Sequence, residues 1–124
     1  MRSEQARGKI KLNGEEFEAL FDTEAPRSVI PKEVALRLGE YIELPEGKKY
    51  ELRTAKGAKV RIIGTCSAVP EIAGYKAPTT AFEVSEDVKE IIIGRTQICE
   101  WDIIFTPEGP RPKGPIELIL PTLF

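Results

Sequence analysis

The chain has 124 residues, a length that suits one domain with a modest core. Its 18 Lys and Arg against 20 Asp and Glu give a net charge of −2, so it lacks the positive field that a nucleic-acid-binding protein needs. With no histidine and two cysteines, one chain cannot build the usual four-ligand zinc site, and histidine-based catalysis is excluded.

Targeting and redox features are sparse. No apolar run is long enough to cross a bilayer, and the polar start Met1–Arg7 lacks the apolar segment of a signal peptide, so we expect a soluble, cytoplasmic protein that binds no membrane. Cys66 and Cys99 are predicted to be small buried side chains in a reducing compartment. Few side-chain amides together with 31% charged residues resemble thermophile usage.

Taken in order, the chain is predicted to begin with a flexible tail at residues 1–7, followed by one domain at residues 8–124. Two strand-like runs, Gly8–Leu12 and Glu15–Phe21, flank Asn13-Gly14. Asn-Gly tolerates positive φ at both positions and therefore favours a two-residue hairpin turn.

The second of these runs ends abruptly in a carboxylate. Asp22 follows an apolar strand and precedes Thr23 and Glu24, so it is expected at the mouth of the core. Burial and a neighbouring carboxylate both favour the protonated form of an Asp, which would make Asp22 a candidate acid or base. The alternative is that Asp22 or Thr23 only caps a turn or a helix start.

The middle of the chain predicts a helix and a second hairpin. Pro31–Gly39 has proline in the first turn, apolar contacts, and a terminal glycine, which is typical of a short helix. Tyr41–Gly47 is expected to be a connecting loop. The alternating segments 48–54 and 60–63 predict strands joined by a tip at 55–59 that has little to bury and should be mobile.

The second half continues as strands. Gly64–Ile72 and Ala77–Val84 are expected to pair across a turn at Gly74-Tyr75. After a break at Ser85–Asp87, the continuous apolar run Ile91–Ile93 indicates a strand buried on both faces.

The end of the chain is more varied. A helix of about two turns is predicted at Arg95–Trp101 and a strand at Asp102–Phe105, and the Pro- and Gly-rich segment Thr106–Pro115 is expected to be a loop. The apolar segment Ile116–Phe124 would be an exposed edge unless paired, which suggests a partner chain. Many short strands and two short helices together predict a small closed or nearly closed β-barrel.

Two segments carry a family resemblance. Ala19 to Ala25, followed by Ser28-Val29-Ile30, resembles the active-site motif of the retropepsin-like (retroviral-type) aspartic proteases, with Glu24 in place of the usual glycine. The run Ile91–Arg95 and the segment Trp101–Ile104 resemble the second signature, with Thr96 in place of the usual Asp or Asn. The resemblance covers residues 8–120 and is to single-domain chains of the prokaryotic type.

This resemblance implies a mostly all-β, retropepsin-like closed β-barrel with one or two short helices, assembled as a homodimer. Each chain would supply one catalytic Asp22, and the two carboxylates would share one proton and activate a water for hydrolysis of a peptide or protein substrate. Thr23 would hydrogen-bond across the dimer, and no cofactor or metal is required.

The resemblance also assigns the surroundings of the site. Gly94 would allow the strand and the loop to pack closely, and Arg95 would hold the following helix. The hairpin tip would close over an extended peptide. The residues implied in substrate binding are Ala25, Val29, Lys56, Gly57, Ala58, Ile63 and Ile92.

Glu24 leaves the activity open. A side chain at the glycine position adds carboxylates near the catalytic pair, so activity should lie toward acid pH. Three outcomes remain: a weak or unusual protease, a dimeric peptide-binding or dimerisation module that has lost catalysis, and a pocket of four carboxylates that captures calcium or magnesium. Alternatively, Glu24 points away from the cleft and pairs with Lys32 or Arg27, which would leave catalysis possible.

Overall fold

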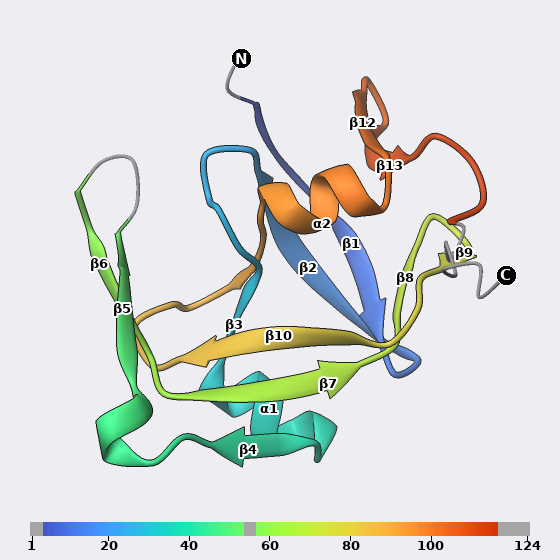
Figure 1. Ribbon diagram of the computed structural model, residues 1–124. Coiled ribbons are helices and arrows are strands. Elements are labelled where there is room, and N and C mark those ends of the chain that lie inside the picture. The colour runs from blue at the N-terminus through green and yellow to red at the C-terminus, as the bar shows by residue number, and fades with distance from the viewer. Residues whose placement is uncertain (1–3, 54–56, 117–124) are drawn as a thin grey trace, which may run out of the picture.

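The computed structural model describes residues 4–53 and 57–116, which form a mostly β fold with two short helices (Figure 1). The elements of the first half are β1 (Gln5–Leu12), β2 (Glu15–Asp22), β3 (Val29–Pro31), α1 (Lys32–Leu38), β4 (Tyr41–Glu43), the 3-10 helix η1 (Glu46–Lys48), β5 (Tyr50–Arg53) and β6 (Lys59–Ile62). Those of the second half are β7 (Gly64–Ala68), β8 (Pro70–Ile72), β9 (Tyr75–Lys76), β10 (Thr80–Ser85), β11 (Ile91–Ile93), α2 (Arg95–Glu100), β12 (Ile103–Thr106) and β13 (Gly109–Pro112).

Nine of the described strands form one sheet in the order β4-β7-β10-β3-β11-β2-β1-β8-β9. β11 runs parallel to β2 and antiparallel to β3, and β3 runs parallel to β10. The order is open, with the short strands β4 and β9 at its two ends, so the expected closure into a barrel is not seen among the described residues.

The predicted first hairpin is confirmed. Asn13 and Gly14 both have positive φ, 52° and 84°, and β1 pairs with β2 along its whole length. The ladder begins at Gln5, which lies opposite Asp22, so residues 5–7 belong to a strand rather than to the expected tail. Ala6 and Gly8 face inward and continue the alternation of Ile10 and Leu12. Because both are small, the apolar alternation that predicts a strand is weak in this part of the sequence.

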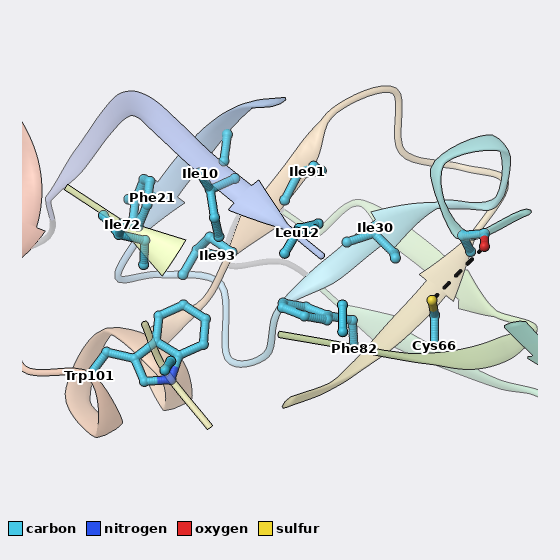
Figure 2. Close-up of a cluster of buried hydrophobic side chains, with 14 of the residues drawn as sticks. Ile10, Leu12, Phe21, Ile30, Cys66, Ile72, Phe82, Ile91, Ile93 and Trp101 are labelled. Atoms are coloured by element: carbon cyan, nitrogen blue, oxygen red, sulfur yellow. Dashed lines mark hydrogen bonds between the residues drawn. The ribbon is translucent and has the colours of Figure 1, made fainter. Parts of the chain in front are cut away.

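The core lies between β1–β2, β10–β11 and the end of α2 (Figure 2). Phe21, Phe82 and Trp101 are its largest side chains and are at most 1% exposed. Cys66 is buried there as predicted, and burial raises the pKa of its thiol. Cys99 is exposed on α2, so the prediction that it is buried was wrong.

Both predicted helices are confirmed. α1 follows Pro31 and ends at Gly39, whose φ of 84° closes the helix, and α2 begins after Gly94. The segment 41–47, predicted as a loop, instead contains β4 and the start of η1, because Tyr41–Glu43 pairs with the edge of β7. Propensity alone does not reveal an edge pairing of three residues.

The predicted strand pair after β6 exists but is divided differently. Ala73 and Gly74 form the turn, with φ of 52° and 85°, and Tyr75 already belongs to β9. The left-handed conformation is unfavourable for alanine, so the turn was predicted one residue later, at Gly74-Tyr75.

The predicted loop 106–115 was wrong in part, because β13 pairs with β12. A two-stranded ribbon needs N–H donors from every second residue of each strand, so Pro110 and Pro112, two positions apart, can both be accommodated. Pro110 packs on β1, where a side chain at Gly8 would meet its ring at 2.8 Å. The apolar segment 117–124 lies outside the described residues.

The second predicted hairpin is confirmed as β5 paired with β6, and these two strands form a separate sheet. The described helices include none that is long and apolar enough to cross a membrane.

Candidate functional site

The loop at residues 22–28 joins β2 to β3 and carries Asp22 at its start. The Asp22 carboxylate is partly exposed at the end of a strand whose preceding residue, Phe21, is fully buried. Its Oδ1 accepts the Glu24 backbone N–H at 2.9 Å, and its Oδ2 accepts the Gln5 side-chain amide at 3.3 Å. These two donors orient the carboxylate at the surface.

Thr23 is held by the start of the same chain. Its backbone N–H donates to the Glu4 carbonyl at 3.0 Å, while its hydroxyl accepts the Glu4 N–H at 2.7 Å and donates to the Glu4 carbonyl at 3.1 Å. Glu4 and Gln5 therefore belong to the candidate site. Neither was predicted there, because both lie in the segment expected to be a flexible tail.

Gly94 packs directly against the 22–28 loop. A Cβ at this position would lie 2.4 Å from the Arg27 carbonyl oxygen and 2.8 Å from that of Ala25, so any side chain would collide with backbone. The Gly94 N–H donates to the buried Ser28 hydroxyl at 3.0 Å, and that hydroxyl donates to the Gln97 side chain at 2.6 Å. Gln97 is a further residue that the sequence analysis did not single out.

The first turn of α2 continues this contact. The Arg95 N–H donates to the Ala25 carbonyl at 2.7 Å, and the Arg95 guanidinium donates to the Thr23 carbonyl at 3.5 Å. Thr96 stands where the family has Asp or Asn, and its hydroxyl donates to the Pro26 carbonyl at 2.9 Å. The loop is thus tied to α2 by both backbone and side-chain donors.

Two of the three predicted subsite walls lie together. Val29 on β3 is directly opposite Ile92 on β11, and Val29 is buried but lies outside the main core cluster. Ile63, in contrast, belongs to the core cluster.

The predicted hairpin tip is described only in part. Gly57 and Ala58 are exposed, and Gly57 has a φ of 85°. Lys56 lies outside the described residues.

Glu24 is exposed at the position of the family's glycine. Its two suggested partners form ion pairs elsewhere, Arg27 with Glu83 at 2.7 Å and Lys32 with Glu43 at 3.6 Å. Within residues 4–53 and 57–116 there is no group of three or more His, Cys, Asp or Glu side chains that could hold a metal ion.

An open cavity of about 380 Å³ lies beside Thr23. Its apolar lining comes from α2 and β12, and Ile104 in this lining is 40% exposed. Ile104 on β12 thus presents an apolar side chain to solvent next to the motif, while Ile98 and Ile103 are buried.

The comparisons with known proteins bear on the fold. No family model and no curated protein matches the sequence. Among solved structures, the chain is similar to the retroviral protease-like domain of Ddi1 from Leishmania major, with a TM-score of 0.63 and 20% identity over 84% of this chain and 82% of that one. It is also similar to EIAV protease complexed with the inhibitor HBY-793, with a TM-score of 0.57 and 20% identity over 77% of this chain and 86% of that one.

This chain therefore has a retropepsin-like fold. At 20% identity the likeness establishes the fold, and the chemistry has to be argued from the residues at the site.

Proposed function

We propose that the chain is one subunit of a homodimeric aspartic endopeptidase to which each subunit contributes Asp22. The observation that carries the proposal is the position of this carboxylate: it follows the buried Phe21 at the end of β2 in a retropepsin-like fold and is oriented by two N–H donors. Both structural neighbours are protease or protease-like domains by description.

In the proposed dimer, the two Asp22 carboxylates face each other across the symmetry axis. Two carboxylates held this close cannot both ionise easily, so the pair holds one proton. The ionised member takes a proton from a bound water as the water attacks the peptide carbonyl, and the protonated member donates to the carbonyl oxygen. This reaction needs no cofactor.

The surroundings of Thr23 support a partner on this side. An exposed Ile104 next to the motif is an apolar group that a second subunit would cover. A hydroxyl accepts two hydrogen bonds, and the Glu4 N–H supplies one of them, so the Thr23 hydroxyl can accept a second from the partner chain.

The proposed peptide lies extended between the 22–28 loop and the β5–β6 hairpin. Ala25 and the Val29–Ile92 pair are the proposed contacts on the loop side, with Ile63 as a further wall. The hairpin tip at Lys56, Gly57 and Ala58 would close over the peptide and pair with its backbone.

Glu24 favours a second candidate, a dimeric peptide-binding or dimerisation module without catalysis. The side chain stands in the segment that would face substrate, where the family has glycine. The two candidates share the fold and the dimer and differ in turnover alone. A cytoplasmic location and a thermophilic source remain predictions from the sequence.

The deciding experiment is turnover of a mixed peptide library between about pH 3 and pH 7 by the native chain and its Glu24→Gly and Asp22→Asn variants. Cleavage by the native chain and by Glu24→Gly, abolished in Asp22→Asn, is the result we expect. Cleavage by Glu24→Gly alone would favour the binding module. If neither the native chain nor Glu24→Gly cleaves any peptide while both stay folded, the protease proposal would be wrong.

A further inference from the structure

One carboxylate joins the 22–28 loop to the β5–β6 hairpin. Oε1 of Glu83, on β10, accepts the Arg27 guanidinium N–H at 2.7 Å and the Tyr50 hydroxyl at 2.7 Å. Arg27 belongs to the 22–28 loop and Tyr50 is the first residue of β5. Three segments far apart in the sequence therefore meet at a single oxygen atom.

Glu83 is the shielded member of this cluster, since the Arg27 side chain is 57% exposed and Tyr50 is 36% exposed. The Glu83 side chain is 13% exposed, and its Oε2 is buried without a hydrogen-bond partner in the described part of the chain. A buried carboxylate needs donors to offset the loss of hydration. Here Arg27 and Tyr50 supply them, both through Oε1.

The protonation state of Tyr50 keeps this contact in place. Burial, and next the hydrogen bond to Glu83, raise the pKa of Tyr50 to about 12, so the hydroxyl remains a donor at all ordinary pH values. The hydrogen bond to Glu83 likewise raises the pKa of Arg27.

The hairpin has few other attachments. β5 and β6 pair with each other and share no ladder with the nine-stranded sheet in the part of the chain that is described. Arg61 on β6 donates its backbone N–H to Asp87 at 2.8 Å and its guanidinium N–H to Glu46 at 2.7 Å. Neither of these acceptors touches the 22–28 loop, whereas Glu83 contacts both the hairpin and that loop.

We propose that Glu83 is a positioning residue that couples the β5–β6 hairpin to the 22–28 loop, which carries Asp22, and holds the two segments in the geometry that accepts a peptide. The inference rests on the proposed function for its peptide. Movement of the hairpin away from the loop removes the Tyr50 hydroxyl from Glu83 and leaves a buried carboxylate with one donor. The observed position of the hairpin is therefore favoured before any peptide binds.

The test compares Tyr50→Phe and Glu83→Leu with a matched control, Glu90→Gln. Tyr50→Phe removes one hydroxyl, and Glu83→Leu removes the carboxylate while keeping an apolar side chain of similar size. Glu90 pairs with Arg7 at 3.1 Å on the other side of the motif and touches neither the hairpin nor Arg27. Hydrogen exchange of the backbone amides of β5 and β6 is measured in each protein, together with global stability.

We expect the rate of hydrogen exchange in the hairpin to rise about tenfold in Tyr50→Phe, because a change of this size corresponds to the loss of one hydrogen bond to a charged group. Exchange in β1 and β2 should stay as in the native chain. Glu83→Leu should loosen both the hairpin and the residues around Arg27. Native-like hairpin exchange in both variants would overturn the proposal, as would an equal rise in Glu90→Gln.

Activity provides a separate readout. On a peptide that the native chain cleaves, Tyr50→Phe should raise KM about tenfold and keep kcat within about twofold, because the hairpin positions substrate and leaves the Asp22 pair untouched. An unchanged KM alongside a lost kcat would contradict the positioning role. If the native chain cleaves no peptide, the proposed function fails, and hydrogen exchange still decides the role of Glu83.

Discussion

The 22–28 loop and the β5–β6 hairpin both rise on the same side of β10 (Figure 1), yet different interactions hold them. Backbone N–H groups of Thr23, Gly94 and Arg95 donate the hydrogen bonds that fix the loop, and its backbone packs so closely on Gly94 that no side chain fits there. The hairpin is joined to its surroundings by the buried Ile62 of β6, and by the Tyr50 hydroxyl and the backbone and guanidinium N–H groups of Arg61, which donate to acidic side chains.

This difference suits a site with one rigid and one movable wall. A catalytic carboxylate has to be held within a fraction of an ångström, which backbone contacts achieve. A segment that admits a long substrate has to open, and contacts that a few side chains make can break without unfolding the sheet.

The strongest way to break the rigid side is Gly94→Ala. The added Cβ would collide with the backbone oxygens of Arg27 and Ala25, so we expect a loss of about 3 kcal/mol in the free energy of unfolding, measured with denaturant. Gly47→Ala is the control, because no atom lies within 4 Å of a Cβ there. An equally stable Gly94→Ala would show that the loop is less tightly packed than described.

Ser28→Ala tests the hydrogen bonds of the same contact. The substitution removes the acceptor of the Gly94 N–H and the donor to Gln97, at a residue that is 3% exposed. Leaving buried polar groups unpaired should cost about 1–3 kcal/mol in denaturant unfolding. A cost close to zero would mean that these groups find other partners.

Low pH should destabilise the segment that leads into the hairpin, residues 43–49, before it destabilises the 22–28 loop. The Tyr41 hydroxyl and Lys49 lower the pKa of Glu43, and Lys49 lowers that of Glu46, both below the ordinary 4.5. Because the folded-state values are depressed, this stabilisation is present above about pH 4.5 and is lost as pH falls through the folded values.

We therefore expect hydrogen exchange in β5 and β6 to accelerate below that pH, and Glu43→Gln to reduce the pH dependence. Glu108→Gln is the control, since Glu108 is exposed and has no ion pair in the described segments. Equal acid sensitivity of the loop and the hairpin would contradict the comparison.

The smallest effect concerns Tyr50 at high pH. Its pKa is raised to about 12, so the contact with Glu83 is complete below about pH 10 and is lost as pH rises through about 12. Burial also raises the pKa of Tyr41, so ultraviolet titration should show late tyrosines, and Tyr50→Phe should remove the component near pH 12. Complete titration of every tyrosine near the ordinary value would rule out the contact between Tyr50 and Glu83.

The sequence predicted the elements whose chemistry is local. Asn13-Gly14 specified its turn, Gly39 ended its helix, and the apolar run Ile91–Ile93 predicted a strand, of which Ile91 and Ile93 are buried and Ile92 is partly exposed. Long-range contacts were missed because no short-range pattern encodes them. β4 and β13 form only against β7 and β12, and Glu4 enters the site only because β1 extends as far as Asp22.

The candidate site divides in the same way. The motif residues Asp22 and Thr23 and the close approach at Gly94 could be inferred from the pattern, whereas Glu83 could not. Glu83 lies 56 residues from Arg27 and 33 from Tyr50, and it acts through burial that only the fold creates. The exposed Cys99 was missed for the same reason, since α2 turns that residue away from the core.

The most direct test of the account mixes the native chain with a tenfold excess of Asp22→Asn and measures peptide cleavage. If each active site needs Asp22 from two chains, random pairing leaves about one tenth of the native subunits in fully native dimers, and activity should fall to about one tenth. A size tag on the Asp22→Asn chain gives mixed dimers their own elution volume, so size-exclusion chromatography of the mixture verifies that subunits exchange. Activity that stays constant in an exchanged mixture would show that one chain carries a complete site, and the shared Asp22 pair would be wrong.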